Sequence, residues 1–448
     1  MSEFANPDET EPSEAVVLRK VWRRLIPYLL LLFVVSIIDR GNIAIARLQM
    51  VDDLHILSEL DYSWGASSFF IGYILFQIPS NLVLVRVGAR RWIAFLLVTW
   101  GLISMGMMWV TGRWSFCGMR VLLGIAEAGF FPGVILYISH WFPARARAHA
   151  VAMFMTGALI ASFVGNPLSG AILQYMDQVG GLRGWRWIFL LEGIPAVILG
   201  FVTLRYLTDC PEHAKWLTPA EREWLARELA KDNSKISTGH SHSLSAAFLN
   251  PRVWLLIGIY FCIAVGDNAY GYYIPSFVKS QFPGWSVVQI GLLTAGPAVI
   301  AMIGMNLVGR HSDQTGERRW HLAGCGFLAS LGWAGLALAP NPWIFLVAMA
   351  VALTGVKGML PTFWTLPASF LTGPAAAGGI ALINCMGNLG GMTAPVIVGE
   401  LKSAYGSFTY GYLFVAGALF LGGLLTLRVR VGPQSKKTMS SASKMGYK

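Results

Sequence analysis

Twelve long apolar segments separated by short polar loops constrain the fold of this 448-residue chain more than any other feature. A helix needs about 20 apolar residues to cross a bilayer, and backbone exposed to lipid must satisfy its own hydrogen bonds. A barrel strand would need only about 10 residues of alternating pattern. The segments are therefore predicted to be transmembrane helices at 25–48, 63–87, 92–111, 114–140, 149–176, 185–207, 251–278, 286–309, 320–339, 342–370, 375–402 and 408–428.

The composition supports an all-α membrane protein. Hydrophobic residues make up 55% of the chain and charged residues 13%, against about 25% charged residues in an average soluble domain. The mean hydropathy is +0.56. These values exclude a disordered chain, a coiled coil and an ordinary soluble enzyme. The five cysteines are widely spaced, so we expect neither disulfides nor a metal site.

The positive charge is distributed as a topology signal. The net charge is +11, which could indicate nucleic-acid binding, but the basic residues lie in short loops between apolar segments. Cytoplasmic loops of membrane proteins are enriched in Lys and Arg. We therefore expect both termini in the cytoplasm, a place in the cell inner membrane, and no nucleic-acid partner. In this topology six basic residues lie on the outer side of the membrane and three lie within spans. The six are Arg47, Arg113, Arg183, Arg186, Lys279 and Lys402, and the three are Arg40, Arg120 and Lys357.

One long polar segment divides the chain into halves of six spans each. Thr218, Pro219 and Glu221 form the pattern of a capped helix start, and an apolar stripe that includes Leu225 follows. This predicts an amphipathic helix on the inner membrane face. His240 and a second histidine two residues later could bind a metal, but a solvated linker is favoured. The predicted units are a tail at 1–24, a bundle at 25–207, a linker at 208–250, a bundle at 251–428 and a tail at 429–448.

A loop motif indicates that the two halves are repeats. The segment 309–319, Gly-Arg-His-Ser-Asp-Gln-Thr-Gly-Glu-Arg-Arg, follows the eighth span, and a shorter basic echo at 86–91 follows the second span. Motifs at equivalent positions of two halves are typical of transporters built from parallel repeats.

Six ionisable residues lie deep inside predicted spans. A charge at the middle of the bilayer costs about 2.5–3.5 kcal/mol on insertion scales, so these side chains should face a polar cavity and partly neutralise one another. They all belong to spans 1, 4, 7 and 10, which we expect to converge on one central cavity. The six are Asp39, Arg40, Arg120, Glu127, Asp267 and Lys357.

Helix geometry separates these charges into two kinds of subsite. Asp39 and Arg40 point roughly 100° apart, so they cannot share a partner. Arg120 and Glu127 share a face but lie about 10 Å apart, too far for a direct ion pair. Arginine grips a carboxylate with a planar fork, whereas a buried carboxyl group can hold a proton. We therefore expect an anion subsite linked to a proton subsite, with helix-stabilising ion pairs as the alternative.

The remaining cavity candidates have plausible structural roles as well. For Asp267, a role in function and a role in packing are equally expected. Lys357 lies next to Gly358 and close to Gly355, which leave room around it, and it would suit a second anionic group. A further set could bind a polar substrate or shape the cavity, with interhelical bonding and packing as the alternatives. This set comprises Asn384, Asn388, Tyr73 and Trp364.

Five segments together resemble the major facilitator superfamily, and more narrowly its anion:cation symporter family. They begin at Asp39 (Asp-Arg-Gly-Asn), at Arg120 (Arg-Val-Leu-Leu-Gly-Ile-Ala-Glu-Ala-Gly-Phe-Phe-Pro-Gly), at Trp141 (Trp-Phe-Pro-Ala-Arg), at Gly184 (Gly-Trp-Arg-Trp-Ile-Phe-Leu-Leu-Glu-Gly) and at Pro211 (Pro-Glu-His-Ala-Lys-Trp-Leu-Thr). The resemblance extends from residue 25 to about residue 430. The first-half loop lacks the acidic residue that usually precedes its arginines.

The resemblance implies twelve helices in two six-helix bundles and inward symport of an organic anion with protons. It implies proton coupling by Asp39 and Glu127, substrate binding by Arg40 and Arg120, and a nearby Tyr73. Tartrate-, phthalate- and aromatic-carboxylate-type permeases are the most similar members, and Lys357 favours a dicarboxylate over a sugar acid or an aromatic monocarboxylate. No cofactor is implied, and we expect a monomer.

Two other classes of function remain as alternatives. A proton-driven exporter of drugs or metabolites is suggested by the run Gly-Asn-Pro-Leu-Ser-Gly at 165–170, although cavity arginines disfavour cationic drugs. A membrane enzyme or receptor is disfavoured, because no nucleophile, metal cluster or cofactor loop is recognisable in the sequence.

Overall fold

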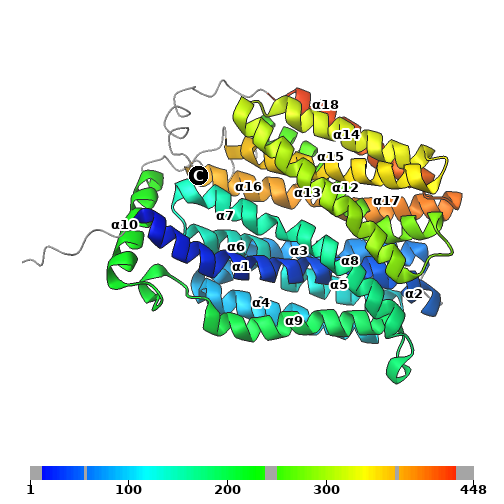
Figure 1. The fold of residues 1–448 in the computed structure, drawn as a ribbon, viewed down its shortest axis with the longest axis horizontal. Helices are drawn as coiled ribbons and strands as arrows, with labels where there is room; N and C mark the ends of the chain where they lie inside the picture. The colour runs from blue at the N-terminus through cyan, green and yellow to red at the C-terminus, as the bar shows by residue number, and fades with distance from the viewer. Residues whose placement is uncertain (1–12, 55–57, 238–249, 369–372, 430–448) are drawn as a thin grey trace, which may run out of the picture.

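The computed structural model describes residues 13–54, 58–237, 250–368 and 373–429, and every regular element within them is a helix (Figure 1). Twelve of its helical segments are long and apolar enough to cross a membrane. This confirms the all-α prediction and the twelve predicted spans, with shifted ends. The largest difference is in the first span, which was expected to begin at residue 25, whereas its helix begins at Glu14.

The first six spans form one bundle, which lies in the lower part of Figure 1. Several of these spans are built from two consecutive helices. The elements are α1 (Glu14–Gly41) with α2 (Ile43–Asp53), α3 (Glu59–Val87), α4 (Ala89–Gly106) with η1 (Met107–Trp109), α5 (Arg113–Glu127) with α6 (Phe130–Ser139), α7 (Ala144–Met155) with α8 (Gly157–Tyr175), and α9 (Gly184–Tyr206) preceded by η2 (Val179–Gly181).

The last six spans form a second bundle above the first. The elements are α12 (Pro251–Gln281), α13 (Val287–Thr315), α14 (Arg319–Leu338), α15 (Pro342–Ala368), α16 (Gly373–Gly387) with α17 (Leu389–Tyr405), and α18 (Thr409–Leu427). The bundles meet where α3 packs against α17 and where α8 packs against α13.

The helix interruptions fall beside the predicted site residues. The residue between α1 and α2 is Asn42, directly after the pair Asp39 and Arg40; α5 ends at Glu127; and the residue between α16 and α17 is Asn388. Asn42 and Asn388 keep helical dihedral angles, so each span continues with only a local change in hydrogen bonding. Irregular backbone at membrane depth is tolerated where it lines a cavity or is buried in protein, which fits these positions.

Two glycines bring α3 and α5 into close contact. A Cβ atom on Gly124 would lie 2.0 Å from the carbonyl oxygen of Phe69, and one on Gly72 would lie 2.2 Å from that of Val121. Small residues allow membrane helices to approach this closely. The contact brings the aromatic side chains of α3 next to the ionisable side chains of α5.

The linker begins with η3 (Pro211–His213) and the amphipathic helix α10 (Pro219–Ser237), which lies at the left-hand end of the molecule in Figure 1. The predicted cap is present, since the backbone N–H of Thr218 donates to Glu221 and that of Glu221 donates back to the Thr218 hydroxyl. Leu225 is fully buried, and Lys20 Nζ of α1 lies 2.5 Å from Glu221 Oε1. The helix is therefore docked on the first bundle by an ion pair. His240 lies outside the described residues.

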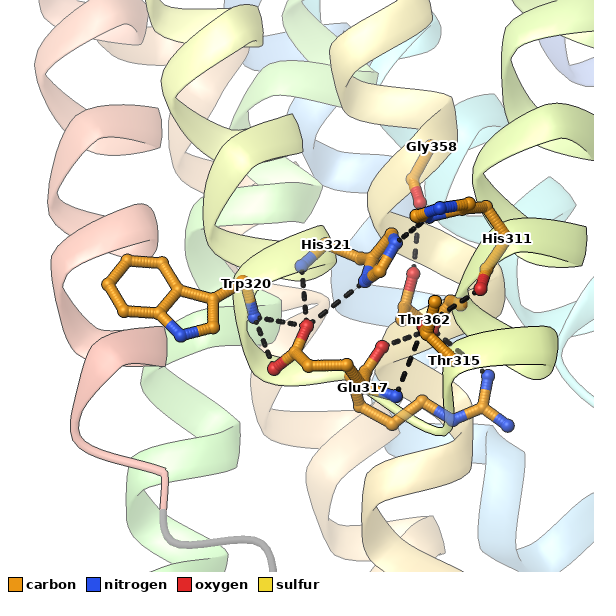
Figure 2. Close-up of polar contacts among 9 residues, drawn as sticks. His311, Thr315, Glu317, Trp320, His321, Gly358 and Thr362 are labelled. Carbon is orange, nitrogen blue, oxygen red and sulfur yellow. Dashed lines mark hydrogen bonds and ion pairs between the residues drawn. The ribbon is translucent and has the colours of Figure 1, made fainter.

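The loop motif between α13 and α14 folds into a polar cluster (Figure 2). Gly316 ends α13 with a φ of +68°, a conformation that favours glycine. Glu317 then accepts hydrogen bonds from the backbone N–H groups of Trp320 and His321 at the start of α14. The His321 Nδ1 atom lies 3.0 Å from Glu317 Oε2, and its Nε2 atom lies 2.6 Å from His311 Nδ1. The motif thus caps a helix and fixes a tight turn.

Replacing Glu317 by Ala is expected to destabilise the protein at neutral pH by about 1 kcal/mol, the usual effect of losing a helix cap. Burial alone would raise the pKa of Glu317, but the hydrogen bonds from Trp320 and His321 outweigh it and lower the pKa. The stabilisation is therefore present above the unfolded-state pKa and is lost as the pH falls through the folded-state pKa. Thermal unfolding of both proteins from pH 7 downwards should show converging midpoints, and a constant difference would contradict this.

An arginine closes the contact between the bundles at the end of the molecule where α2 lies, called here the α2 end. Arg47 of α2 is buried, with its guanidinium 4.8 Å from the ring centroid of Tyr62 in its own bundle. It also lies 5.1 Å from Tyr273 and 5.9 Å from Phe408 of the second bundle, and it hydrogen-bonds to Ser276. Two further bonds cross here, from Tyr62 to the Tyr272 carbonyl at 3.0 Å and between Ser63 and Tyr273 at 2.7 Å.

Candidate functional site

A cavity of about 290 Å³ lies between the two bundles. Its walls come from spans 1, 7 and 10, as predicted, and from span 4 through Phe130 and Phe131. They also come from α8 and α3, which the sequence analysis did not foresee as major contributors. Seven of the ten predicted site residues line it: Arg40, Tyr73, Asp267, Lys357, Trp364, Asn384 and Asn388.

Arg40 forms an ion pair with Glu127 at the wall of the cavity. Its Nη2 atom lies 2.7 Å and its Nε atom 3.1 Å from Glu127 Oε2. The Arg40 side chain is 26% exposed, whereas that of Glu127 is fully buried behind it. The other carboxylate oxygen, Oε1, has no hydrogen-bond partner among the described residues. A proton could therefore be held there without breaking an existing contact.

The ring of Phe69 lies next to both deep arginines of the first bundle, Arg40 and Arg120. The guanidinium groups of Arg40 and Arg120 both lie over the ring of Phe69, each 4.9 Å from its centroid. Arg40 also lies over Tyr73 at 5.0 Å. Arg120 is 1% exposed and donates to the Tyr272 hydroxyl at 3.2 Å. Arg120 thus stays behind the cavity wall and reaches the second bundle through a tyrosine that does line the cavity.

A second ion pair, between Lys357 and Asp267, lies in the wall formed by the other bundle. Lys357 Nζ of α15 is 2.5 Å from Asp267 Oδ1 of α12. Both side chains line the cavity, and they are 14% and 34% exposed. The two cationic side chains of the cavity wall, Arg40 and Lys357, are therefore each paired with an acid from another helix of their own bundle.

Asp39 points away from the cavity, which differs from the expectation that all six deep charges would face it. Its carboxylate is fully buried against α4, where Trp100 Nε1 donates at 3.1 Å and Ser104 Oγ donates at 2.8 Å. The expectation is also wrong for Arg120 and Glu127, which are absent from the cavity lining. The physical reason is that a deep charge can be satisfied by a neighbouring side chain as well as by water.

The polar and aromatic candidates of the second bundle lie on the cavity wall. Asn388 Nδ2 donates to the carbonyl and the side-chain oxygen of Asn384, at 2.8 Å and 3.2 Å. Both hydrogen bonds lie within one span rather than between spans. Trp364 packs edge-on against Tyr260, 5.0 Å between centroids, so it forms part of an aromatic wall.

Sequence reasoning missed several residues at or behind the cavity wall. Tyr260 and Tyr272 line the cavity, but a tyrosine gives no signal that separates this role from packing. Glu192 is buried behind the wall, where it accepts from Ser169 at 2.6 Å while its Oε2 atom has no partner among the described residues. Its place in the Gly184 segment could have identified it, although it lies near one end of its span.

The family follows from a comparison with known proteins. The model of the Major Facilitator Superfamily matches residues 29–395 and 284–445. The chain belongs to the Major Facilitator Superfamily. It is a multi-pass membrane transporter of small molecules and not an enzyme. The resemblance at the sequence level is thereby confirmed.

Relatives in the Major Facilitator Superfamily cover nearly the whole chain. A protein of Agrobacterium vitis named "Putative tartrate transporter" is 45% identical over 96% of this chain and 95% of its own length. A protein of Acinetobacter baumannii named "Quinolone resistance transporter" is 39% identical over 95% and 98%. The solved structure of a D-xylose-proton symporter has a TM-score of 0.71 at 18% identity, covering 92% of this chain and 99% of that one, and shows the shared fold.

Proposed function

We propose that this transporter is a proton-coupled symporter that imports a small organic anion by alternating access. The substrate class is a carboxylate, with a dicarboxylate such as tartrate or phthalate favoured. The observation that carries the proposal is the Arg40–Glu127 pair, in which a cavity-lining cation is held by a buried acid with one unpartnered oxygen. The name of the Agrobacterium vitis relative supports the choice of substrate.

The pair couples an anion to a proton by competition. A substrate carboxylate that binds the Arg40 fork replaces the Glu127 carboxylate as its partner. A buried carboxylate without its cation is strongly disfavoured, so Glu127 binds a proton at the same step. Because the coupling is reciprocal, a proton on Glu127 also frees Arg40 for the anion. Substrate and proton are therefore taken up and released together.

Further residues are proposed to shape or support this step. Arg120 adds positive potential behind the wall and, through Tyr272, connects the subsite to the other bundle. Asp39 was expected to take part in proton coupling. We infer that it acts through the packing of α1 against α4, because its carboxylate accepts hydrogen bonds from Trp100 and Ser104 of α4. The proposed setting is the inner membrane, as a monomer, with both termini in the cytoplasm.

Uptake by purified protein in liposomes tests the proposal. With a pH gradient, acidic outside, labelled tartrate should accumulate, and a protonophore should abolish the accumulation. Empty liposomes give the background. Equal tartrate flux with and without the gradient would contradict proton coupling.

The second candidate function is proton-driven export, which the name of the Acinetobacter baumannii relative favours. An antiporter would take up labelled substrate when the pH gradient is reversed, acidic inside, and would show no accumulation in the first arrangement. The two directions of the same gradient therefore separate symport from antiport.

A further inference from the structure

Two cation–acid pairs lie at the cavity wall, one in each bundle. Arg40 of α1 is paired with Glu127 of α5, and Lys357 of α15 is paired with Asp267 of α12. In each pair the cation lines the cavity. With all four groups ionised, their charges sum to zero, so each of the two cavity-lining cations is neutralised by its own acid.

The second pair can be approached directly from the cavity. Asp267 is 34% exposed and lines the wall, whereas Glu127 is fully buried behind Arg40. The titratable groups that the structure places near Asp267 are Lys357 from α15 and Tyr260 from its own helix. Tyr260 also interacts electrostatically with Arg40. The two pairs therefore lie within electrostatic reach of one shared group.

We propose that Lys357 binds the second carboxylate of a dicarboxylate substrate and that Asp267, displaced from it, takes up a second proton. This inference rests on the proposed function and adds to it a dicarboxylate subsite and a second coupling acid. The Lys357 ammonium has three donors and can contact two carboxyl groups. Two ionised carboxylates on one ammonium would leave one negative charge uncompensated at the cavity wall, and a proton on Asp267 removes it.

The proposal predicts how many protons accompany each kind of substrate. A dicarboxylate brings two negative charges, one for Arg40 and one for Lys357, and is matched by protons on Glu127 and Asp267. A monocarboxylate that engages only Arg40 is matched by one proton. If the second pair were only a link between α12 and α15, the number of protons would be the same for both kinds of substrate.

Calorimetry on the purified full-length protein measures this number. Titrations in two buffers with different ionisation enthalpies give the protons taken up per ligand bound. Tartrate is the dicarboxylate probe, and glycerate, which lacks one of its carboxylates, is the matched monocarboxylate. We expect about two protons with tartrate and about one with glycerate. Asp267→Asn should lower the tartrate value to about one and leave the glycerate value unchanged.

Two further variants keep the test sharp. Asp267→Asn with Lys357→Met removes both partners and avoids an unpaired charge; it should bind tartrate no more tightly than glycerate, at about one proton each. Asp52→Asn, on the exposed part of α2, is the matched control and should behave as the unaltered protein.

The outcomes separate the inference from the proposed function. Two protons with tartrate in Asp267→Asn, or about one in the unaltered protein, would overturn the inference and leave proton-coupled anion transport standing. If the unaltered protein binds neither probe, the proposed function is wrong and the inference falls with it.

Discussion

Arg40→Gln is expected to weaken carboxylate binding by at least about 100-fold. Hydrogen bonds to charged groups are worth about 1.5–3 kcal/mol each, and every 1.4 kcal/mol is a factor of ten in the dissociation constant. Arg40 can offer the substrate the two N–H groups that it donates to Glu127 in the structure. The measurement is the dissociation constant for tartrate with the purified variant.

Two comparisons show whether the loss comes from this subsite. Arg40→Lys keeps the charge but not the planar fork, so it should lose about tenfold in affinity. Arg86→Gln, at the exposed end of α3, removes an equal charge outside the cavity and should bind normally. Unchanged affinity in Arg40→Gln would place the anion elsewhere in the cavity.

Glu127→Gln is expected to abolish accumulation of a monocarboxylate such as glycerate driven by the pH gradient, while sparing exchange of labelled for unlabelled glycerate. The amide keeps an oxygen that can accept from Arg40 but cannot ionise, so binding no longer requires a proton. The variant should therefore bind glycerate with little dependence on pH, whereas the unaltered protein should bind glycerate more weakly as the pH rises. Uptake into liposomes measures both modes in one preparation.

Glu192→Gln is an informative comparison for the Glu127→Gln variant. Glu192 is also a buried acid with one oxygen that has no partner among the described residues, but its other oxygen accepts from Ser169 and not from a cation. The competition mechanism assigns coupling to the acid that is paired with Arg40. Accumulation of glycerate that survives in Glu127→Gln and is lost in Glu192→Gln would reverse the assignment.

The sequence was sufficient to predict the twelve-helix architecture because only a few kinds of backbone structure can span a bilayer. Apolar length alone located the twelve spans, and the repeated loop motif and the long polar linker indicated two halves. The start of the first span was placed too late because 19–24 contains four basic residues, which resemble a polar tail in the sequence, whereas in the structure they belong to the same helix as the apolar residues that follow. The helix interruptions at Asn42 and Asn388 were not predicted, since nothing in their local pattern distinguishes them from a continuous helix.

The site was predicted as a set of residues but not as a set of partners. The position of a charge along a span indicates its depth, whereas the direction of its side chain depends on neighbouring helices. Asp39 found donors on α4, so it had no need of the cavity. The pairing of Arg40 with Glu127 joins residues 87 positions apart, and it depends on the close approach of helices that only the folded structure reveals.

The aromatic setting of Arg47 has a consequence for the transport cycle. If the two bundles part at the α2 end, that guanidinium must leave the rings of Tyr273 and Phe408, which belong to the opposite bundle. Each such contact is worth about 0.5–2 kcal/mol, enough to keep the α2 end closed at rest yet small enough for thermal motion to overcome. We therefore expect the residues around Arg47 to influence the rate of transport, and the residues of the cavity wall to determine which substrate is bound.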